Sequence, residues 1–148
     1  MRLTLYTDYA LRVLIYLAAK ENDELSSIRE ISDIYGISKN HLMKIIYKLG
    51  KMGIIETIRG RNGGIRLAMK PKDINIGEVV RQTEEDFRLV ECFDPENNFC
   101  VISPVCGLRH ILNHALAAYL AVLDQYTLAD LVADPEKYRM HFSKQAGK

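Results

Sequence analysis

The sequence predicts a mainly α-helical protein with one small β-hairpin: a winged helix-turn-helix domain followed by a long C-terminal dimerisation helix. Three observations predict this fold class. Two capped helical segments flank Gly36, as in a helix-turn-helix. A hairpin pattern follows at residues 54–69, and an apolar stripe runs along residues 108–126. We expect a winged domain at 1–72, a short helix and cysteine loop at 73–107, and the dimerisation helix and tail at 108–148.

The composition fits a folded chain outside the membrane. Of 148 residues, 48% are hydrophobic, which is normal for a globular protein. The longest uninterrupted apolar run, from Ala115 to Leu123, is too short to cross a bilayer. The first eight residues lack the apolar core and cleavage site of a signal peptide. We therefore expect a cytoplasmic protein with reduced thiols and no membrane partner.

The net charge of +1 is near neutral, but positive and negative residues are concentrated in different segments of the chain. Residues 38–72 hold nine Lys and Arg against Glu56 alone, a net +8, whereas residues 73–100 hold two Arg against eight Asp and Glu, a net −6. A basic segment of this kind is the electrostatic footprint of a nucleic-acid-binding protein.

The first helix is expected to begin at a Thr7 cap and to run to about Glu21, with Asp8 in its first turn, where the helix dipole favours an anion. We expect Asn22-Asp23 to break it. Its apolar residues recur at helical spacing and predict one buried face: Leu11, Leu14, Ile15 and Ala18.

The next two helices form the predicted helix-turn-helix. Ser27 and Glu30 make a capping box for the second helix, and Gly36 ends it. Ser38 caps the third helix, which we expect to stop near Gly53. Its predicted buried residues are Leu42, Ile45, Ile46 and Leu49, and its exposed ones are Lys39, Asn40, His41, Lys44, Lys48 and Lys51. The alternative is an ordinary surface helix, without a DNA-binding role, that carries lysines on its solvent-exposed face.

A hairpin directly after the third helix is typical of a wing. Residues 54–59 and 65–69 alternate as strands around the glycine-rich turn at 60–64. A phosphate-binding loop is excluded because such a loop requires a following helix, and a strand follows here. Arg59, Arg61 and Arg66 suit DNA phosphates or a minor groove.

These elements together predict a winged-helix DNA-binding protein. Asn40 suits an adenine edge and Lys44 a guanine edge in the major groove. His41 is as suited to a phosphate, whereas Lys39, Arg59 and Arg61 should mainly set affinity. The expected DNA-contacting residues are Ser38, Lys39, Asn40, His41, Lys44, Arg59, Arg61 and Asn62.

After Pro71 closes the wing, residues 75–83 predict a short helix, and residues 105–126 predict a long one. A broad apolar stripe on a DNA-binding protein favours pairing with a second copy; burial against the first helix of the same chain is the alternative. The expected interface residues are Leu108, Leu112, Ala115, Tyr119 and Val122. Thr127 should cap a last short helix through Ala133, Asp134-Pro135 should stop it, and the tail after Lys144 should fray.

Cys92, Cys100 and Cys106 are the only cysteines, and they fall in one segment, residues 91–106, without helical or strand period. We call this segment the cysteine loop. The wide spacing and missing fourth cysteine disfavour structural zinc. The pattern leaves open an iron–sulfur cluster with a non-cysteine ligand, zinc, or three small buried residues without metal. A thiol enzyme with Cys100 or Cys106 as nucleophile and His110 as base lacks any supporting motif, so we do not expect an enzyme.

Three segments make the chain resemble the Rrf-type winged-helix transcriptional regulators. They are residues 4–11 (TLYTDYAL), 38–46 (SKNHLMKII) and 59–67 (RGRNGGIRL). With the three cysteines and residues 124–131 (DQYTLADL), they are similar to the nitric-oxide-sensing branch of that family, over residues 3 to about 132. The resemblance implies a homodimeric cytoplasmic repressor of a double-stranded DNA operator. It also implies one iron–sulfur cluster per subunit, usually [4Fe–4S] with [2Fe–2S] as the alternative, whose reaction with nitric oxide releases DNA.

The same resemblance implies the metal ligands. Cys92, Cys100 and Cys106 take the three cysteine roles, and Asp8 matches the acidic fourth ligand of the nitric-oxide-sensing branch. A sister branch, which regulates cluster assembly, uses a histidine where this chain has Arg109. His110 stands one residue late, a rotation of about 100° around a helix. Asp8 is therefore the expected fourth ligand and His110 its rival, with a plain helix-start anion as the other interpretation of Asp8. The functional alternatives are a regulator of that sister type and a cluster-free winged-helix regulator that binds a small effector.

Overall fold

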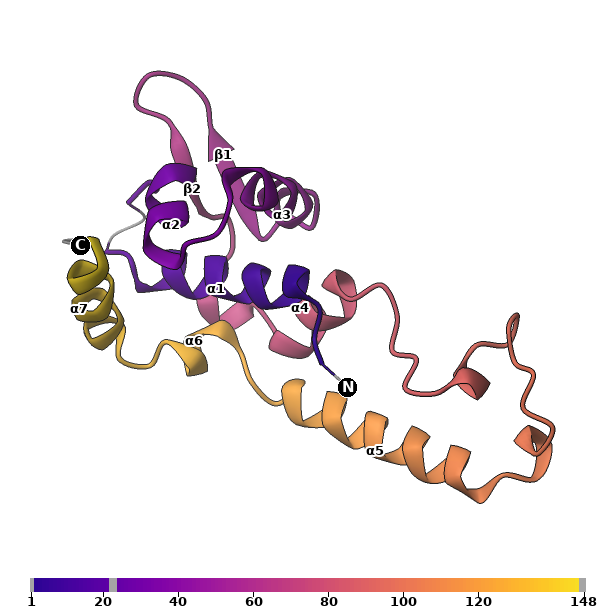
Figure 1. Cartoon of the computed structure of the whole chain (residues 1–148). Helices are drawn as coiled ribbons and strands as arrows, with labels where there is room; N and C mark the ends of the chain where they lie inside the picture. The colour runs from indigo at the N-terminus through magenta and orange to yellow at the C-terminus, as the bar shows by residue number, and fades with distance from the viewer. Residues whose placement is uncertain (1, 22–23, 147–148) are drawn as a thin grey trace.

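The computed structural model of the protein describes residues 2–21 and 24–146, so the predicted break at Asn22-Asp23 lies outside the described residues. A helical body carries the hairpin at one end and a long helix at the other (Figure 1), which confirms the predicted fold class. The elements in chain order are α1 Leu5–Ala19, α2 Ile28–Tyr35, α3 Lys39–Lys51, β1 Ile55–Ile58, β2 Gly64–Leu67, α4 Ile76–Thr83, α5 Gly107–Leu123, α6 Leu128–Leu131 and α7 Pro135–Ala146.

Helix α1 is capped one turn earlier than predicted. The Thr4 hydroxyl accepts a hydrogen bond from the Thr7 backbone N–H, whereas Thr7 itself is buried inside the helix. Glu84, at the end of α4, accepts hydrogen bonds from the Thr4 backbone N–H (2.8 Å) and hydroxyl (2.9 Å). This contact from a distant segment holds Thr4 outside the helix, and a local sequence pattern could not reveal it. The helix also ends at Ala19, before the predicted Glu21.

Helices α2 and α3 form as predicted. Ser27 and Glu30 complete the capping box, and Gly36 ends α2 with a φ of 65°, which a residue with a Cβ rarely adopts. Ser38 caps α3, its hydroxyl accepting from the backbone N–H of His41 at 3.3 Å. The predicted apolar face of α3 is buried and packs with α1 and α2 into one core, through Leu42, Ile45, Ile46 and Leu49.

The wing is an antiparallel hairpin in which Glu56 pairs with Arg66 across the strands. A backbone bridge between Ser26 and Ile65 anchors it to the segment before α2, with N–O distances of 2.9 and 2.8 Å. Gly63 is required at the turn, since a Cβ there would lie 2.1 Å from the Ile58 carbonyl oxygen.

Helix α5 is shorter than predicted, and its C-terminal end is tied to α4 and to the residue that caps α4. It starts at Gly107 rather than Val105, because residues 103–105 form a separate 3₁₀ turn and Cys106 is extended. Arg81 of α4 forms a bidentate ion pair with Asp124, which is the C-cap of α5. The Asn75 amide donates to the Asp124 carbonyl oxygen at 2.7 Å. These contacts fix the C-terminal end of α5 against α4.

The C-terminal end differs from prediction. Thr127 and Asp130 form the capping box of α6, which ends at Leu131 instead of Ala133. The residues predicted as a stop also start a new helix, α7: Asp134 accepts from the backbone N–H of Lys137 at 3.2 Å, and Pro135 is its first residue. Helix α7 continues to Ala146, past the predicted fraying point at Lys144.

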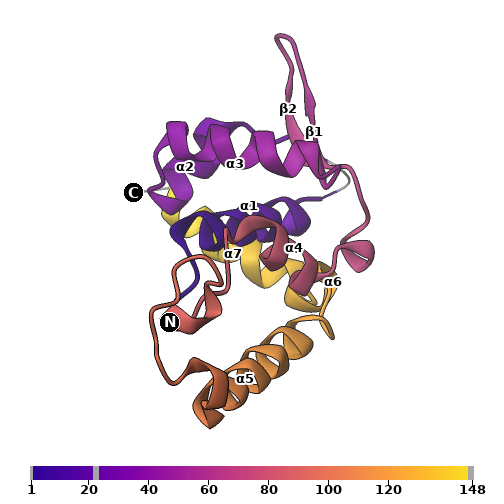
Figure 2. The ribbon, with the colours of Figure 1, turned by 90° about the vertical axis from the view of Figure 1, so that its right-hand side faces the viewer.

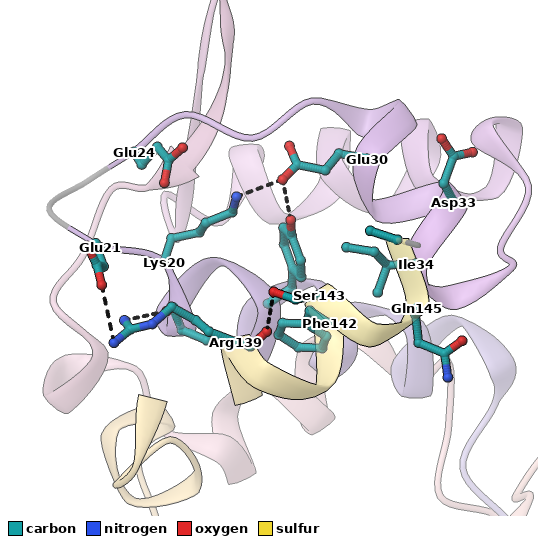
Figure 3. Close-up of a pocket in the computed structure, with 13 residues that line it drawn as sticks. Lys20, Glu21, Glu24, Glu30, Asp33, Ile34, Arg139, Phe142, Ser143 and Gln145 are labelled. Carbon is teal, nitrogen blue, oxygen red and sulfur yellow. Dashed lines mark hydrogen bonds and ion pairs between the residues drawn. The ribbon is translucent and has the colours of Figure 1, made fainter. Parts of the chain in front are cut away.

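Helix α7 packs beside α1 and α2 and borders a cavity of about 490 Å³ (Figure 3). Phe142 lies with its ring centroid 5.0 Å from that of Tyr16 and 5.8 Å from that of Tyr35. At the cavity wall, the Glu30 carboxylate accepts from the Tyr16 hydroxyl and from Lys20 Nζ at 2.6 Å. Burial acts to raise the pKa of Glu30, but these two hydrogen bonds outweigh it and hold the pKa below its usual value.

Candidate nucleic-acid interface and cysteine loop

Helix α3 and the wing lie at the same end of the molecule, away from α5 (Figure 2). All predicted DNA-contacting residues of α3 and its N-cap are exposed: Ser38, Lys39, Asn40, His41 and Lys44. The Ser38 hydroxyl is already engaged as the helix cap. We call these residues, together with Arg59, Arg61 and Asn62 of the wing turn, the basic surface.

Helix α1 supports the basic surface from behind. The Tyr6 hydroxyl donates to the Lys44 carbonyl oxygen at 3.2 Å, and the Tyr9 ring lies 6.4 Å from the His41 ring, centroid to centroid. The sequence pattern of the third helix alone did not indicate either contact. Both contacts hold the first turns of α3, which carry the base-reading residues of a helix-turn-helix.

Arg59, Arg61 and Asn62 are exposed in the wing turn. Arg66 is not free to join them, because its Nε lies 2.6 Å from the Glu56 carboxylate across the hairpin. Among the described residues, no ion pair involves Arg59, Arg61 or the exposed lysines of α3. The only acidic residue of segment 38–72 is thus used inside the wing, and the basic surface keeps its positive charge.

The cysteine loop projects from the body between α4 and α5 (Figure 1). Polar side chains of the loop, and Arg88 just before it, hold its conformation. Buried Asp94 accepts from the Arg88 guanidinium, from the Asn97 amide at 2.9 Å and from the Glu96 backbone N–H at 3.0 Å. The Asn97 hydrogen bond, with the Glu96 N–H and the Arg88 charge, lowers the pKa of Asp94 despite opposing burial. Glu91 accepts from the Phe99 backbone N–H at 2.6 Å.

Cys92, Cys100 and Cys106 are free thiols, each half-buried. Their donor chemistry fits an iron–sulfur cluster, which cysteine thiolates ligate. However, within residues 2–21 and 24–146 no three His, Cys, Asp or Glu side chains gather as a metal site requires. The single chain therefore supplies the donors but does not arrange them around one point.

Among the described residues, neither predicted fourth ligand joins two of the thiols in a group of three donors. Asp8 pairs with Arg12 one turn later on α1, with Arg12 Nη2 at 2.8 Å and Nε at 3.1 Å from the carboxylate. The Arg12 guanidinium also lies 5.8 Å from the Tyr9 ring centroid. His110 is exposed on the first turn of α5. The Asp8–Arg12 pair was missed, although its spacing of four residues on a helix could have indicated it.

The apolar stripe of α5 is largely uncovered within one chain. Leu108 is 58% exposed and Val122 52%, and Ala115 is also exposed, whereas Leu112 and Tyr119 are half-buried. Helix α5 packs against α4, so the alternative of burial against the first helix is not what the structure shows. Tyr119 lines a second cavity, of about 480 Å³, with residues 84–89 and the chain start. In the part of the chain that the structure describes, no helix has the length and apolarity to cross a membrane.

Comparisons with known proteins agree with this architecture. The family model Rrf2, described as an iron-dependent transcriptional regulator, matches residues 3–134. The chain is 69% identical over 136 residues to the HTH-type transcriptional regulator NsrR of Bacillus subtilis, covering 92% of this chain and 93% of that protein. It is 64% identical to NsrR of Bacillus licheniformis, covering 94% and 97%. The structure of T. potens IscR superposes with a TM-score of 0.72 at 25% identity, covering 93% of this chain and 90% of that one.

Proposed function

We propose, since the chain belongs to the Rrf2 family of iron-dependent transcriptional regulators, that this DNA-binding regulator is a cytoplasmic homodimeric repressor controlled by an iron–sulfur cluster that senses nitric oxide. One observation carries the proposal. A single chain combines an exposed basic surface with three free thiols on a loop that joins α4, which packs on the winged domain, to the uncovered helix α5.

The basic surface is the proposed operator contact. Asn40 and Lys44 would read base edges in the major groove, and Arg59, Arg61 and Lys39 would bind phosphates or the minor groove. Ser38 would position the backbone of the first turn of α3, because its hydroxyl caps that helix. The unpaired charges of this surface support the proposal, because a cation already neutralised inside the protein contributes little to phosphate binding.

Cys92, Cys100 and Cys106 would hold the cluster, proposed as [4Fe–4S] with [2Fe–2S] as the alternative, and Asp8 would complete the ligand set ahead of His110. When bound, the cluster supplies iron that reacts with nitric oxide. A carboxylate is a harder ligand than a thiolate, so Asp8 would be the weakest-held donor. To serve as a ligand, Asp8 would have to give up its ion pair with Arg12.

Two contacts support a link between the loop and DNA binding. Thr4, which caps the helix that carries Asp8, is bonded to Glu84 at the start of the segment leading to the cysteine loop. At the other end of the loop, α5 is tied to α4 by Arg81 and Asp124. The uncovered stripe of α5 is the proposed contact with a second copy, so a rearranged loop would change how two basic surfaces are spaced along DNA.

A second candidate is a cluster-free regulator that binds a small effector. The separation of the three thiols in one chain and the cavity beside α7 favour it. In that case, the residues that line this cavity would control DNA binding, and the cysteine loop would not.

Anaerobic purification of wild type and Cys100→Ala separates the two candidates. We expect wild type to carry iron and sulfide and to bind its operator tightly, and Cys100→Ala to lose both together. Val101→Ala is the matched control, because Val101 stands beside Cys100, is 92% exposed and has no donor atom. Equal operator affinity for wild type and Cys100→Ala, with iron lost only from the variant, would contradict the proposal and favour the cluster-free regulator.

A further inference from the structure

Two large apolar side chains interrupt the exposed face of α3. Tyr47 is 65% exposed and Met43 is 49% exposed. They stand four residues apart on one helix, so their side chains are neighbours on its surface. Lysines surround them at positions 44, 48 and 51. Exposed apolar surface within a cationic face has no stabilising role in the single chain, because folding does not bury it.

Tyr47 points away from the core. The helix turns about 100° per residue, so Tyr47 falls on the same stripe as Asn40 and Lys51 and opposite the buried Leu42 and Leu49. This stripe is the centre of the solvent side of α3. A helix that enters a major groove with Asn40 foremost therefore also directs Tyr47 toward the DNA.

The protein orients Tyr47 but does not use it. Lys51 Nζ lies 5.0 Å from its ring centroid, a cation–π contact. Among the described residues, four of the eight tyrosine hydroxyls bond to protein acceptors, those of Tyr6, Tyr16, Tyr35 and Tyr138. The Tyr47 hydroxyl, like those of Tyr9, Tyr119 and Tyr126, has no such partner among the described residues. The Tyr47 ring thus stays on the surface, where it contacts Lys51.

From this placement we propose that Tyr47, with Met43 beside it, is a specificity-determining residue whose ring contacts the C5-methyl group of a thymine. The inference rests on the proposed operator binding by α3. The thymine methyl is the apolar group on base edges in the major groove, whereas Asn40 and Lys44 suit hydrogen-bonding edges. The surrounding lysines match the phosphates that flank the groove.

The spacing indicates which base Tyr47 contacts when the axis of α3 follows the major groove. Tyr47 stands seven residues after Asn40, about 10 Å along the helix axis. A base-pair step rises about 3.4 Å, so in that orientation the contacted thymine lies about three base pairs from the base that Asn40 reads. Asn40 and Tyr47 thus read neighbouring parts of one half-site by different chemistry.

The test removes a single methyl group from the DNA. Anaerobically purified full-length protein selects a duplex from a randomised library, and each thymine of that duplex is then replaced in turn by uracil. At one position in each half-site, wild type should lose about fourfold in affinity, the effect of one buried methyl. Tyr47→Ala should bind the thymine duplex that much more weakly and show no further loss with uracil. Tyr47→Phe, which keeps the ring, should behave as wild type.

Lys48→Ala is the matched control, because it removes a neighbouring charge and should lower affinity for thymine and uracil duplexes alike. The inference would be overturned if Tyr47→Ala and wild type showed the same ratio of affinities for the thymine and uracil duplexes. It would also be overturned if only Met43→Ala removed the difference between the two duplexes. A library that yields no preferred sequence for wild type would instead refute the proposed function. The two failures are therefore distinguishable.

Discussion

The winged domain and the cysteine loop are held together by different interactions. The winged domain closes on itself: fully buried Leu14, Leu42 and Leu49 share one core, and capping side chains satisfy its helix starts. The cysteine loop is held mainly by polar side chains of its own segment, while Phe99, at 84% exposed, stays in solvent. One region is complete within a single chain, and the other presents donors and apolar surface that the chain does not use.

This difference indicates where each region obtains its final form. A core that is satisfied internally gives a surface of fixed geometry, as DNA reading requires. A region with uncovered apolar residues and unassembled thiols gains order from what it binds. For this chain, we propose that a metal cluster and a second copy supply that order.

The largest effect should come from breaking the contact between two copies. Leu112→Glu places a charge in the proposed α5 seam, where burial of an unpaired carboxylate is strongly unfavourable. We expect monomers in sedimentation and a loss of operator affinity of roughly a hundredfold or more, because two linked half-sites are no longer engaged together. Asn113→Glu, on the same helix but off the stripe, is the control and should remain dimeric. An intact Leu112→Glu dimer would remove α5 from the interface.

A smaller effect should distinguish base reading from phosphate binding on the basic surface. Asn40→Ala should relax sequence preference and cost roughly 1–3 kcal/mol at the cognate operator. Arg61→Ala should weaken binding to all sequences equally and reduce its dependence on salt concentration. Both are measured by titration at several salt concentrations. Unchanged discrimination between operator and random DNA in Asn40→Ala would show that the base-reading assignment is wrong.

The smallest effect concerns the support of the winged domain rather than either surface. Hydrogen bonds from Lys20 and Tyr16 lower the pKa of Glu30 in the folded state. Its contribution to stability is therefore present above the usual value of 4.5 and is lost as the pH falls below that value. Since the carboxylate is 37% exposed, we expect Glu30→Gln to destabilise by only about 1 kcal/mol near neutral pH.

Denaturant unfolding followed by helical circular dichroism checks this prediction. The difference between wild type and Glu30→Gln should shrink as the pH falls below 4.5, because the wild-type carboxyl becomes protonated. Asp33→Asn is the control, since Asp33 is 68% exposed and its nearest cation, on Arg29, is 3.8 Å away. A difference that stays constant across this range would mean that the charge of Glu30 does not stabilise the fold.

The sequence predicted the winged domain well because its signals are local. Ser27, Gly36 and Ser38 act on backbone groups a few residues away, and the periodicity of α3 reports its buried face directly. The errors arose where distant segments decide. Glu84 selects Thr4 over Thr7 as the α1 cap, and α7 obtains its place from packing of Phe142 on Tyr16 and Tyr35.

For the candidate site, residue identity was predictable and assembly was not. Exposure of the basic surface follows from the helix period and the turn glycines. The engagement of Arg66 by Glu56 depends on strand register, and the pairing of Asp8 with Arg12 competes with its predicted role as ligand. The three cysteines do not gather into one site among the described residues, and their spacing in the sequence gave no indication of this arrangement.

The most direct test of the central claim follows cluster and operator binding in one sample. Anaerobically purified wild type, bound to a fluorescent operator duplex, is titrated with nitric oxide while cluster absorbance and DNA anisotropy are recorded together. We predict that operator affinity falls at least tenfold in step with the loss of cluster absorbance. Operator binding that persists unchanged after the absorbance has disappeared would contradict the account.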